Sequence, residues 1–359
     1  MSLPVWDPDL DDVLVCRAVR TVTATVKTFV FAARTPQRFS FRAGQHLVFA
    51  FEIDPGGADG AEVLRSYTLS SPPTRPDTLS ITVRRRSGGV VSTWLHHHLR
   101  PGMTVRAISE PLGEFTLEDH PAPRYLMLAG GSGITPFLSM LRGLHDHGHT
   151  ADVVLVHAAH TTDDLIQRAE LEVLAAETVG LRTVLVPSSD DGAWPGHRGR
   201  LSAAMLAQIA PDLAERTVLT CGPETFMADL QHQLVEFGCD PGNLHRESFT
   251  FADPAVALQL QGADPAEHPA HAGFPVEFAH LGRTVHCPPG STVLQAAAAA
   301  GITLPSSCSQ GLCGTCKSRL VSGEVDMQHA GGVRPKEIAQ GRFLPCCSVP
   351  LTPLVVDRL

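Results

Sequence analysis

Short apolar runs separated by polar, turn-forming stretches fill the first third of the chain. Six runs rich in Val, Ile, Phe and Thr alternate with turn signals such as DPGGADG and SPPTRPD, a pattern that is typical of antiparallel strands. Regular short strands predict a β-barrel or a β-sandwich, interrupted by one helix. The strands are expected at residues 12–19, 28–33, 45–53, 65–71, 79–85 and 103–108, and the helix at residues 90–99.

A different pattern extends from residue 124 to about residue 250. Apolar strands there alternate with longer helical stretches, which predicts a parallel sheet with helices on both faces. The strands are expected at residues 125–129, 152–158, 182–187 and 217–221, and the helices at residues 134–148, 163–177 and 223–238.

The periodicity weakens over residues 252–273, which are rich in Ala, Pro, Asp and Gly and predict a linker. A third unit begins at Phe274. We therefore expect a multidomain fold of the β, α/β and α+β classes. Its parts are an antiparallel β-barrel over residues 1–120, a parallel α/β domain over residues 121–251, and a small domain over residues 274–359.

The composition is that of an ordinary globular chain, with 43% hydrophobic and 18% charged residues among 359. No apolar run approaches the roughly 18 residues of a membrane helix, and the acidic start MSLPVWDPDLDD does not resemble a signal peptide. We therefore expect a cytoplasmic, reducing location and no membrane partner. The net charge of −9 argues against general affinity for nucleic acid. Residues 273–359 hold 7 Lys+Arg and 5 Asp+Glu, against 21 and 32 in the rest. This uneven distribution of charge either arises by chance or reflects a mildly basic C-terminal part that packs against an acidic body.

Three of the nine cysteines fall within the stretch CSQGLCGTC, which runs from Cys308 to Cys316. In a reducing compartment, clustered cysteines indicate metal ligands rather than disulfides. A C-x4-C-x2-C spacing with a distant fourth cysteine is typical of plant-type [2Fe-2S] clusters. Zinc remains the alternative, although zinc sites more usually pair two C-x2-C segments.

The unit from Phe274 to Leu359 resembles a plant-type ferredoxin domain. The resemblance implies a β-grasp fold and cluster ligands at Cys308, Cys313, Cys316 and Cys346. Cys347 directly follows Cys346, and RFLPCCSVP is interpreted as a short extended segment, in which neighbouring side chains point to opposite faces. The spacing of 29 residues after Cys316 and the resemblance both select Cys346 as the fourth ligand. Cys16, Cys239 and Cys287 are isolated and are expected to be structural.

The stretch RSYTLS at residues 65–70 resembles the R-x-Y-[ST] flavin motif of the ferredoxin–NADP reductase family. The resemblance implies that Arg65 pairs with a flavin phosphate. It also implies that Tyr67 lies against the isoalloxazine ring and that Thr68, where Ser is commoner, places a hydroxyl near flavin N5. Ser66 belongs to the same predicted set of flavin contacts.

The stretch GGVVSTWLHHHL at residues 88–99 matches the G-x-x-S-x-x-L pattern of the same family. Glycine and serine at a helix start present free N–H groups and a positive dipole end to phosphate. The resemblance therefore places the FAD pyrophosphate at Gly89, Val90, Val91 and Ser92. This segment favours FAD over FMN, which related reductases of the same domain order hold. The three histidines at residues 96–98 are interpreted as ordinary residues of the last helical turn.

Two further stretches, LAGGSGITPF at residues 128–137 and CGPETFM at residues 221–227, resemble the nicotinamide motifs of the family. Each follows a predicted strand and opens a predicted helix. The implied contacts are Gly130, Gly131, Gly133, Thr135, Pro136, Cys221, Gly222 and Pro223. In HRESF, Glu247 and Phe249 match the terminal acid and aromatic residue that flank the flavin. Hydride transfer itself needs no acid or base. The expected catalytic set of Thr68, Cys221 and Glu247 would instead hold flavin N5 against nicotinamide C4.

The order of flavin, nicotinamide and ferredoxin domains resembles reductase components of Rieske-type oxygenases and hybrid-cluster-protein reductases. It implies a reductase that takes hydride from NADH onto FAD and passes single electrons through a [2Fe-2S] cluster to a separate terminal oxygenase. The alternatives are a reductase for another acceptor, such as a hybrid-cluster protein, and a redox sensor. NADH is expected rather than NADPH because Asp163 and Asp164 follow the strand at residues 152–158, and a carboxylate suits a free ribose 2′-hydroxyl.

Overall fold

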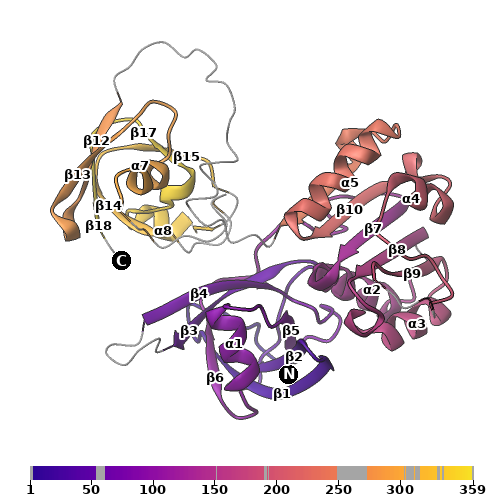
Figure 1. The fold of residues 1–359 in the computed structure, drawn as a ribbon. Coiled ribbons are helices and arrows are strands. Elements are labelled where there is room, and N and C mark those ends of the chain that lie inside the picture. The colour runs from indigo at the N-terminus through magenta and orange to yellow at the C-terminus, as the bar shows by residue number, and fades with distance from the viewer. Residues whose placement is uncertain are drawn as a thin grey trace. The chain divides into compact units, whose positions relative to one another are not determined.

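The chain forms two compact units, Met1–Phe249 and Thr250–Leu359, drawn in Figure 1. The computed structural model describes residues 3–53, 61–150, 152–189, 192, 194–248, 273–302, 304, 311, 316–329, 332–333 and 335–357. The predicted linker at residues 252–273 lies outside these residues, apart from its last position. No helix of the described residues is long and apolar enough to cross a membrane.

The first unit begins with a six-stranded antiparallel sheet in the order β4-β3-β6-β1-β2-β5. A bridge between Leu69 and Ile81 joins the two edge strands and closes the sheet into the predicted barrel. Its interior holds Phe29, Phe31 and Phe49, which are fully buried because alternate residues of each strand face inward. The elements are β1 (Val13–Thr23), β2 (Val26–Ala33), β3 (His46–Ile53), β4 (Ala61–Thr68), β5 (Leu79–Arg84), α1 (Val90–His97) and β6 (Thr104–Ala107).

A five-stranded parallel sheet in the order β11-β10-β7-β8-β9 follows in the same unit (Figure 1). This confirms the predicted α/β domain. Its strands are β7 (Arg124–Gly130), β8 (Asp152–Ala159), β9 (Leu181–Pro187), β10 (Thr217–Gly222) and β11 (Leu244–Ser248). Its helices are α2 (Thr135–Asp146), α3 (Arg168–Glu177), α4 (Ala203–Ile209) and α5 (Glu224–Glu236), with short 3₁₀ turns η1 (Gly131–Ile134), η2 (Thr162–Asp164), η3 (Leu213–Glu215) and η4 (Pro241–Asn243).

The two faces of this sheet are buried by different helices. Tyr125 and Met127 of β7 pack in the cluster that contains the apolar residues of α2 and α3. Leu126 and Leu128 of the same strand pack in the cluster of α4 and α5. Both sets are buried, so β7 is apolar on both faces, as a central parallel strand requires.

One predicted boundary in this domain was wrong, and one helix was not predicted. The helix predicted from Asp163 begins only at Arg168, because Gln167 adopts a left-handed conformation with φ 55° and interrupts the helix. The segment before it forms η2 instead. The short helix α4 was not predicted at all.

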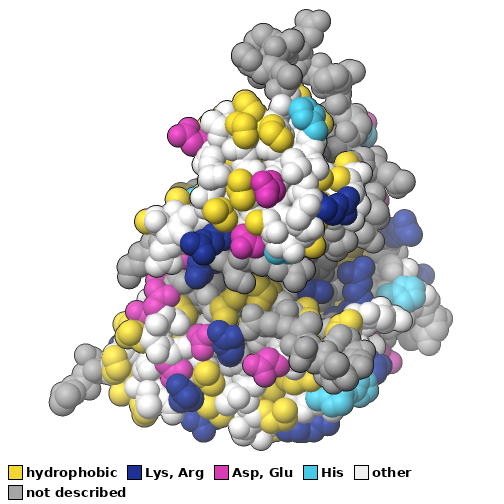
Figure 2. Space-filling view, turned by 90° about the vertical axis from the view of Figure 1, so that its left-hand side faces the viewer, with side chains coloured by type: hydrophobic (Ala, Val, Ile, Leu, Met, Phe, Trp, Pro, Cys, Tyr) yellow, Lys and Arg dark blue, Asp and Glu magenta, His cyan; other side chains and the backbone are white. Residues whose placement is uncertain are grey.

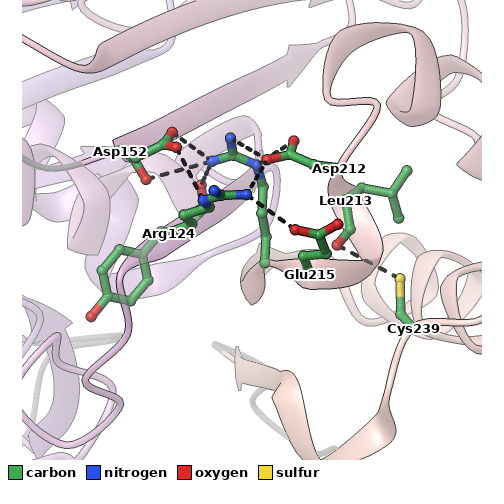
Figure 3. A network of polar contacts seen from close by, with 8 residues as sticks. Arg124, Asp152, Asp212, Leu213, Glu215 and Cys239 are labelled. Carbon is green, nitrogen blue, oxygen red and sulfur yellow. Dashed lines mark hydrogen bonds and ion pairs between the residues drawn. The ribbon is translucent and has the colours of Figure 1, made fainter.

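A buried arginine joins the strand ends on the edge opposite the glycine-rich loops. Arg216 pairs with Asp212 through Nε at 2.8 Å and Nη2 at 2.9 Å, and its Nη1 donates to Asp152 Oδ1 at 2.8 Å. Arg124 joins the same network through Asp212 and Glu215 (Figure 3). These contacts tie β7, β8 and the η3 turn together within the α/β domain alone.

The second unit contains a mixed five-stranded sheet in the order β13-β12-β18-β14-β16, in which β12 and β18 run parallel. Helix α7 contributes Val293 and Ala297 to a core with Val276 and Phe278. This arrangement confirms the predicted β-grasp fold. The elements are β12 (Phe274–Phe278), η5 (Ala279–Leu281), β13 (Arg283–Cys287), α7 (Val293–Ala299), β14 (Ser318–Ser322), β15 (Val325–Met327), α8 (Pro335–Ala339), β16 (Arg342–Phe343), η6 (Pro345–Cys347), β17 (Ser348–Pro350) and β18 (Leu354–Asp357).

Acidic and basic side chains are interspersed over the face drawn in Figure 2, with apolar side chains among them. The large apolar side chains that are exposed belong to many different elements, as is normal for a globular surface.

Candidate flavin, nicotinamide and cluster sites

The predicted flavin contacts of β4 lie beside the aromatic core of the barrel. The Tyr67 ring meets the edges of Phe49 at 6.0 Å and Phe51 at 6.3 Å between ring centroids. Burial raises the pKa of Tyr67, and the nearby charge of Arg65 opposes this shift. Ser66 and Thr68 alternate with these two residues along β4, and each has a buried hydroxyl without a hydrogen-bond partner among the described residues.

The start of α1 carries backbone N–H groups that no side chain caps. Gly89 occupies the N-cap position, and α1 begins at Val90. The Ser92 hydroxyl turns back to the loop, where it accepts from Arg86 N at 3.1 Å. A Cβ atom on Gly89 would lie 2.6 Å from Ser92 Oγ, so a larger residue would make the Ser92 hydroxyl shift. The first-turn N–H groups remain suited to an anionic phosphate.

The three predicted catalytic residues lie together in the structure. Cys221 on β10 is paired in register with Glu247 on β11, and the Thr68 hydroxyl lies near enough to the Glu247 carboxyl to influence its pKa. Burial raises the pKa of Glu247 to about 8, and the interaction with Thr68 opposes that rise. Burial also raises the pKa of the Cys221 thiol, to which the Glu247 charge adds. The site therefore favours a neutral thiol and a protonated carboxyl.

The glycines of the two nicotinamide motifs let the end of β7 pack against the end of β10. A Cβ atom on Gly133 would lie 2.1 Å from Cys221 O, and one on Gly222 would lie 3.0 Å from Gly130 Cα. Gly131 adopts φ +54°, a conformation that favours glycine. Backbone therefore meets backbone here, at the carboxyl edge of the sheet, which is where open α/β sheets bind their ligands.

The remaining residues of these motifs start the two helices that follow. Thr135 is the first residue of α2, is buried, and donates to Ser132 O at 3.2 Å. Pro136 is buried beside it, where a missing N–H costs nothing in the first turn. Pro223 is the N-cap residue of α5 and is exposed.

Two residues near these motifs, the buried His46 and the partly buried Arg84, carry no signal that the sequence motifs above picked out. His46 pairs with Thr68 across β3 and β4, and burial lowers its pKa to about 4, so the ring is neutral. Arg84 ends β5 and lies 3.6 Å from Asp164, with its guanidinium beside the Gly131 backbone. The arginine run VRRR was the only signal for Arg84, and nothing near His46 in the sequence pointed to it.

The two aspartates predicted near the ribose have different environments. Asp164 accepts from Thr161 N at 3.3 Å and from Thr161 Oγ1 at 3.0 Å, and it also faces Arg84. Its carboxylate is therefore engaged locally. Asp163 is exposed at the same turn. Arg168, the first arginine after β8, pairs with Glu172 at 3.0 Å and lies 5.0 Å over the Trp194 ring.

Two of the four predicted cluster ligands fall within the described residues and lie close together. Cys316 and Cys346 are 3% and 7% exposed. The pKa of the Cys346 thiol is lowered mainly by a hydrogen bond with Cys316 and further by one with Cys347. Burial opposes this lowering. Gly311 N also donates to Cys346 Sγ at 3.3 Å. Cys308, Cys313 and Phe249 lie outside the described residues.

The prediction that Cys346 and Cys347 sit in an extended segment was wrong. Both belong to the 3₁₀ turn η6, in which neighbouring side chains diverge by about 120° rather than 180°. Cys346 is buried and Cys347 is partly exposed. A Cβ atom on Gly311 would lie 2.7 Å from Cys347 Sγ. Both sulfurs therefore lie near Gly311, and burial and the Gly311 N–H favour Cys346.

The described residues fit the groups that the motifs imply. The orphaned hydroxyls of Ser66 and Thr68 and the uncapped start of α1 offer hydrogen bonds to a flavin and its phosphates. The buried thiols of Cys316 and Cys346, with a backbone N–H directed at sulfur, suit a thiolate-ligated cluster.

Three family models match successive parts of the chain. They describe an oxidoreductase FAD-binding domain at residues 14–117, an oxidoreductase NAD-binding domain at residues 127–232 and a 2Fe-2S iron-sulfur cluster binding domain at residues 277–351. The glycine betaine monooxygenase reductase subunit of Pseudomonas aeruginosa is 39% identical over 95% of this chain and 94% of its own. The chain belongs to the family of oxygenase reductase subunits.

A second relative agrees with this membership, and a solved structure shows the same fold. The stachydrine N-demethylase reductase subunit of Rhizobium meliloti is 38% identical over 92% of both chains. Phthalate dioxygenase reductase has the same fold, with a TM-score of 0.56 and 23% identity over 98% of this chain and 100% of its own. This member of the family is an NAD(P)H-dependent oxidoreductase with FAD-binding, NAD-binding and [2Fe-2S] cluster-binding domains.

The raised pKa of Glu247 predicts a pH-dependent stability. The native carboxyl holds its proton up to about pH 8, whereas the unfolded one releases it near 4.5. The unfolded state therefore binds fewer protons across this window, and stability falls as pH rises through it. We expect Glu247→Gln to remove this decline, so that its unfolding temperature overtakes that of the wild type by several degrees toward pH 8. Thermal unfolding of the flavin-free protein measures the difference.

The exposed Glu236 supplies the matched control, because Glu236→Gln should follow the wild-type pH profile. Parallel profiles of the wild type and Glu247→Gln across the whole window would show that the Glu247 carboxyl is not shielded as described.

Proposed function

We propose that this protein supplies electrons from NADH to a Rieske-type terminal oxygenase that removes N-methyl groups from a betaine. The identity of 37–39% over nearly the full length of relatives named for glycine betaine monooxygenase and stachydrine N-demethylase carries this proposal. We place the FAD-binding domain at residues 1–120, the NAD-binding domain at residues 121–251, the linker at residues 252–273 and the ferredoxin domain at residues 274–359.

In this proposal, side chains on β4 and the start of α1 hold the flavin, and the two glycine-rich edges hold the nicotinamide. Arg65 and the uncapped N–H groups of α1 bind phosphate, while Tyr67 bounds the ring. When bound, FAD supplies the conversion between a hydride and single electrons. Thr68, Cys221 and Glu247 position the reacting face and exclude water from it.

Reconstitution with a purified Rieske-type betaine N-demethylase tests the function. NADH, oxygen and the betaine are supplied, and formaldehyde release is measured together with NADH consumption. We expect product only when reductase and oxygenase are both present, in proportion to the NADH consumed. NADH-dependent reduction of cytochrome c without any oxygenase turnover would favour another acceptor, such as a hybrid-cluster protein. A protein that NADH reduces but that passes electrons to no acceptor would favour a redox sensor. A protein that NADH does not reduce at all would contradict the proposed function.

The charged residues near the turn that follows β8 predict a preference for NADH. A nearby arginine commonly accommodates a 2′-phosphate, and Arg84 and Arg168 each face a carboxylate instead, Asp164 at 3.6 Å and Glu172 at 3.0 Å. Exposed Asp163 would repel a phosphate. We expect kcat/KM for NADH to exceed that for NADPH by at least about tenfold, on the order of 1.4 kcal/mol. Steady-state cytochrome c reduction with each donor measures the ratio, and a preference for NADPH would contradict the assignment.

A further inference from the structure

Helix α2 carries a stripe of polar side chains at helical spacing. Thr135, Ser139, Arg142 and Asp146 recur at intervals of four, three and four residues, which places them on one face of the helix. Thr135 stands in the first turn, directly after the glycine loop of η1. One helix face therefore extends from the predicted nicotinamide contacts to the far end of α2.

This face meets the loop that follows β4 of the barrel. Ser139 Oγ donates to Ser71 O at 2.6 Å, and Arg142 Nη1 donates to Ser70 O in a short hydrogen bond. Ser139 and Ser70 are fully buried, and Arg142 is 8% exposed. The backbone carbonyls of Ser70 and Ser71 therefore have hydrogen-bond donors from the α/β domain in place of water.

The orientation of Arg142 is itself fixed from the other side. Its Nε and Nη2 donate to the two oxygens of Glu170 on α3, at 2.7 Å and 2.6 Å. A bidentate pair holds the planar guanidinium in a single orientation, which lysine cannot reproduce. The remaining Nη1 is thereby directed at Ser70 O.

The loop is equally well anchored on the barrel side. Ser70 N donates to Ser80 O at 2.7 Å, and its hydroxyl lies 2.9 Å from Thr82 Oγ1. Ser70 follows Thr68 by only two residues, so a shift of the loop moves Thr68 with it. The exposed end of the stripe adds a further contact, in which Asp146 accepts from Arg75 at 2.7 Å and 3.0 Å.

We propose that Arg142 is a positioning residue for hydride transfer, which sets the separation between Thr68 on the flavin strand and Thr135 at the nicotinamide loop. The inference rests on the proposed function, in which NADH binds at that loop and FAD at β4. Rates of transfer depend steeply on placement, since an error of about 1 Å can lower a rate about 100-fold. A residue that only stabilised the fold would change the unfolding temperature without changing the rate of the folded enzyme.

The test compares Arg142→Met/Glu170→Gln with Arg216→Met in the FAD-loaded full-length protein. Arg216 is similarly buried, at 6% exposed, and pairs with Asp212 through two hydrogen bonds, but its hydrogen bonds join residues of the α/β domain. Stopped-flow absorbance gives the limiting rate of flavin reduction at saturating NADH and the NADH dissociation constant separately. Unfolding temperature and bound FAD are measured on the same samples.

We expect the Arg142 variant to reduce flavin about 10- to 100-fold more slowly at saturating NADH, with a dissociation constant within about threefold of the wild type. Arg216→Met should lose stability and keep a limiting rate within about twofold of the wild type. Ser139→Ala, which removes only one hydroxyl, is expected to slow reduction about three- to tenfold, and it serves if the double variant does not fold.

A wild-type limiting rate in folded, FAD-loaded Arg142 or Ser139 variants would overturn the inference while leaving the proposed function intact. An equal loss of rate in Arg216→Met would also overturn it, because the effect would then follow from lost stability. Failure of NADH to reduce the wild-type flavin would instead overturn the proposed function and this inference together.

Discussion

Replacing Cys346 with serine is expected to remove nearly all of the [2Fe-2S] cluster while leaving reduction of the flavin by NADH intact. A hydroxyl is a harder and poorer ligand for iron–sulfur clusters than a thiolate. Cys346 is buried, accepts a hydrogen bond from Gly311 N at 3.3 Å, and lies beside Cys316. Visible absorption and the electron paramagnetic resonance signal of the dithionite-reduced protein measure cluster content, and stopped-flow absorbance measures flavin reduction.

Cys347→Ser is the matched control, because it makes the same change at the next position of η6. Its thiol is partly exposed, and we expect the cluster to remain with a signal close to that of the wild type. The reverse result would place the fourth ligand at Cys347. Retention of the cluster in both single variants, with loss only in the double variant, would show that either sulfur can serve as the ligand.

Gly133→Ala is expected to lower kcat/KM for NADH by at least about 100-fold. The added methyl group would lie 2.1 Å from Cys221 O and 2.6 Å from Gly222 N, both of them backbone atoms that cannot rotate away. The loop η1 and the end of β10 would have to separate, and these segments carry the two halves of the nicotinamide site. Flavin reduction by NADH measures the loss, and bound FAD reports whether the barrel remains folded.

Gly143→Ala tests whether this loss is specific to the site. Gly143 lies within α2, and a Cβ atom there would meet no heavy atom within 4 Å. Alanine should stabilise the helix by about 0.5–1 kcal/mol and leave the rate unchanged. A Gly133→Ala enzyme with wild-type kcat/KM would contradict the packing of η1 against β10.

The parts of the structure that local patterns determine could be predicted from the sequence. The strands of the barrel and of the parallel sheet follow from apolar runs and turn residues, since burial of alternate or successive side chains is a local property. The glycines of η1 could be placed because a strand precedes them and a helix follows. Their required closeness to Cys221 O became visible only in the structure.

Sequence patterns do not predict the structure where a single backbone conformation or a distant contact decides the outcome. Gln167 stops α3 from starting early through a left-handed conformation that glutamine rarely adopts. The Cys346 segment forms a 3₁₀ turn, although its composition suits an extended strand. The bond from Arg142 to Ser70 joins residues 72 positions apart, and no local pattern encodes such a pair.

The central claim is that electrons pass from NADH through the flavin to the cluster within this chain. Its most direct test is to mix the FAD- and cluster-loaded protein with NADH anaerobically, freeze it, and record the electron paramagnetic resonance spectrum alongside the flavin absorbance. The account predicts bleaching of the flavin together with the spectrum of a reduced [2Fe-2S] cluster. A bleached flavin with a cluster that stays oxidised, in a protein whose cluster dithionite does reduce, would contradict it.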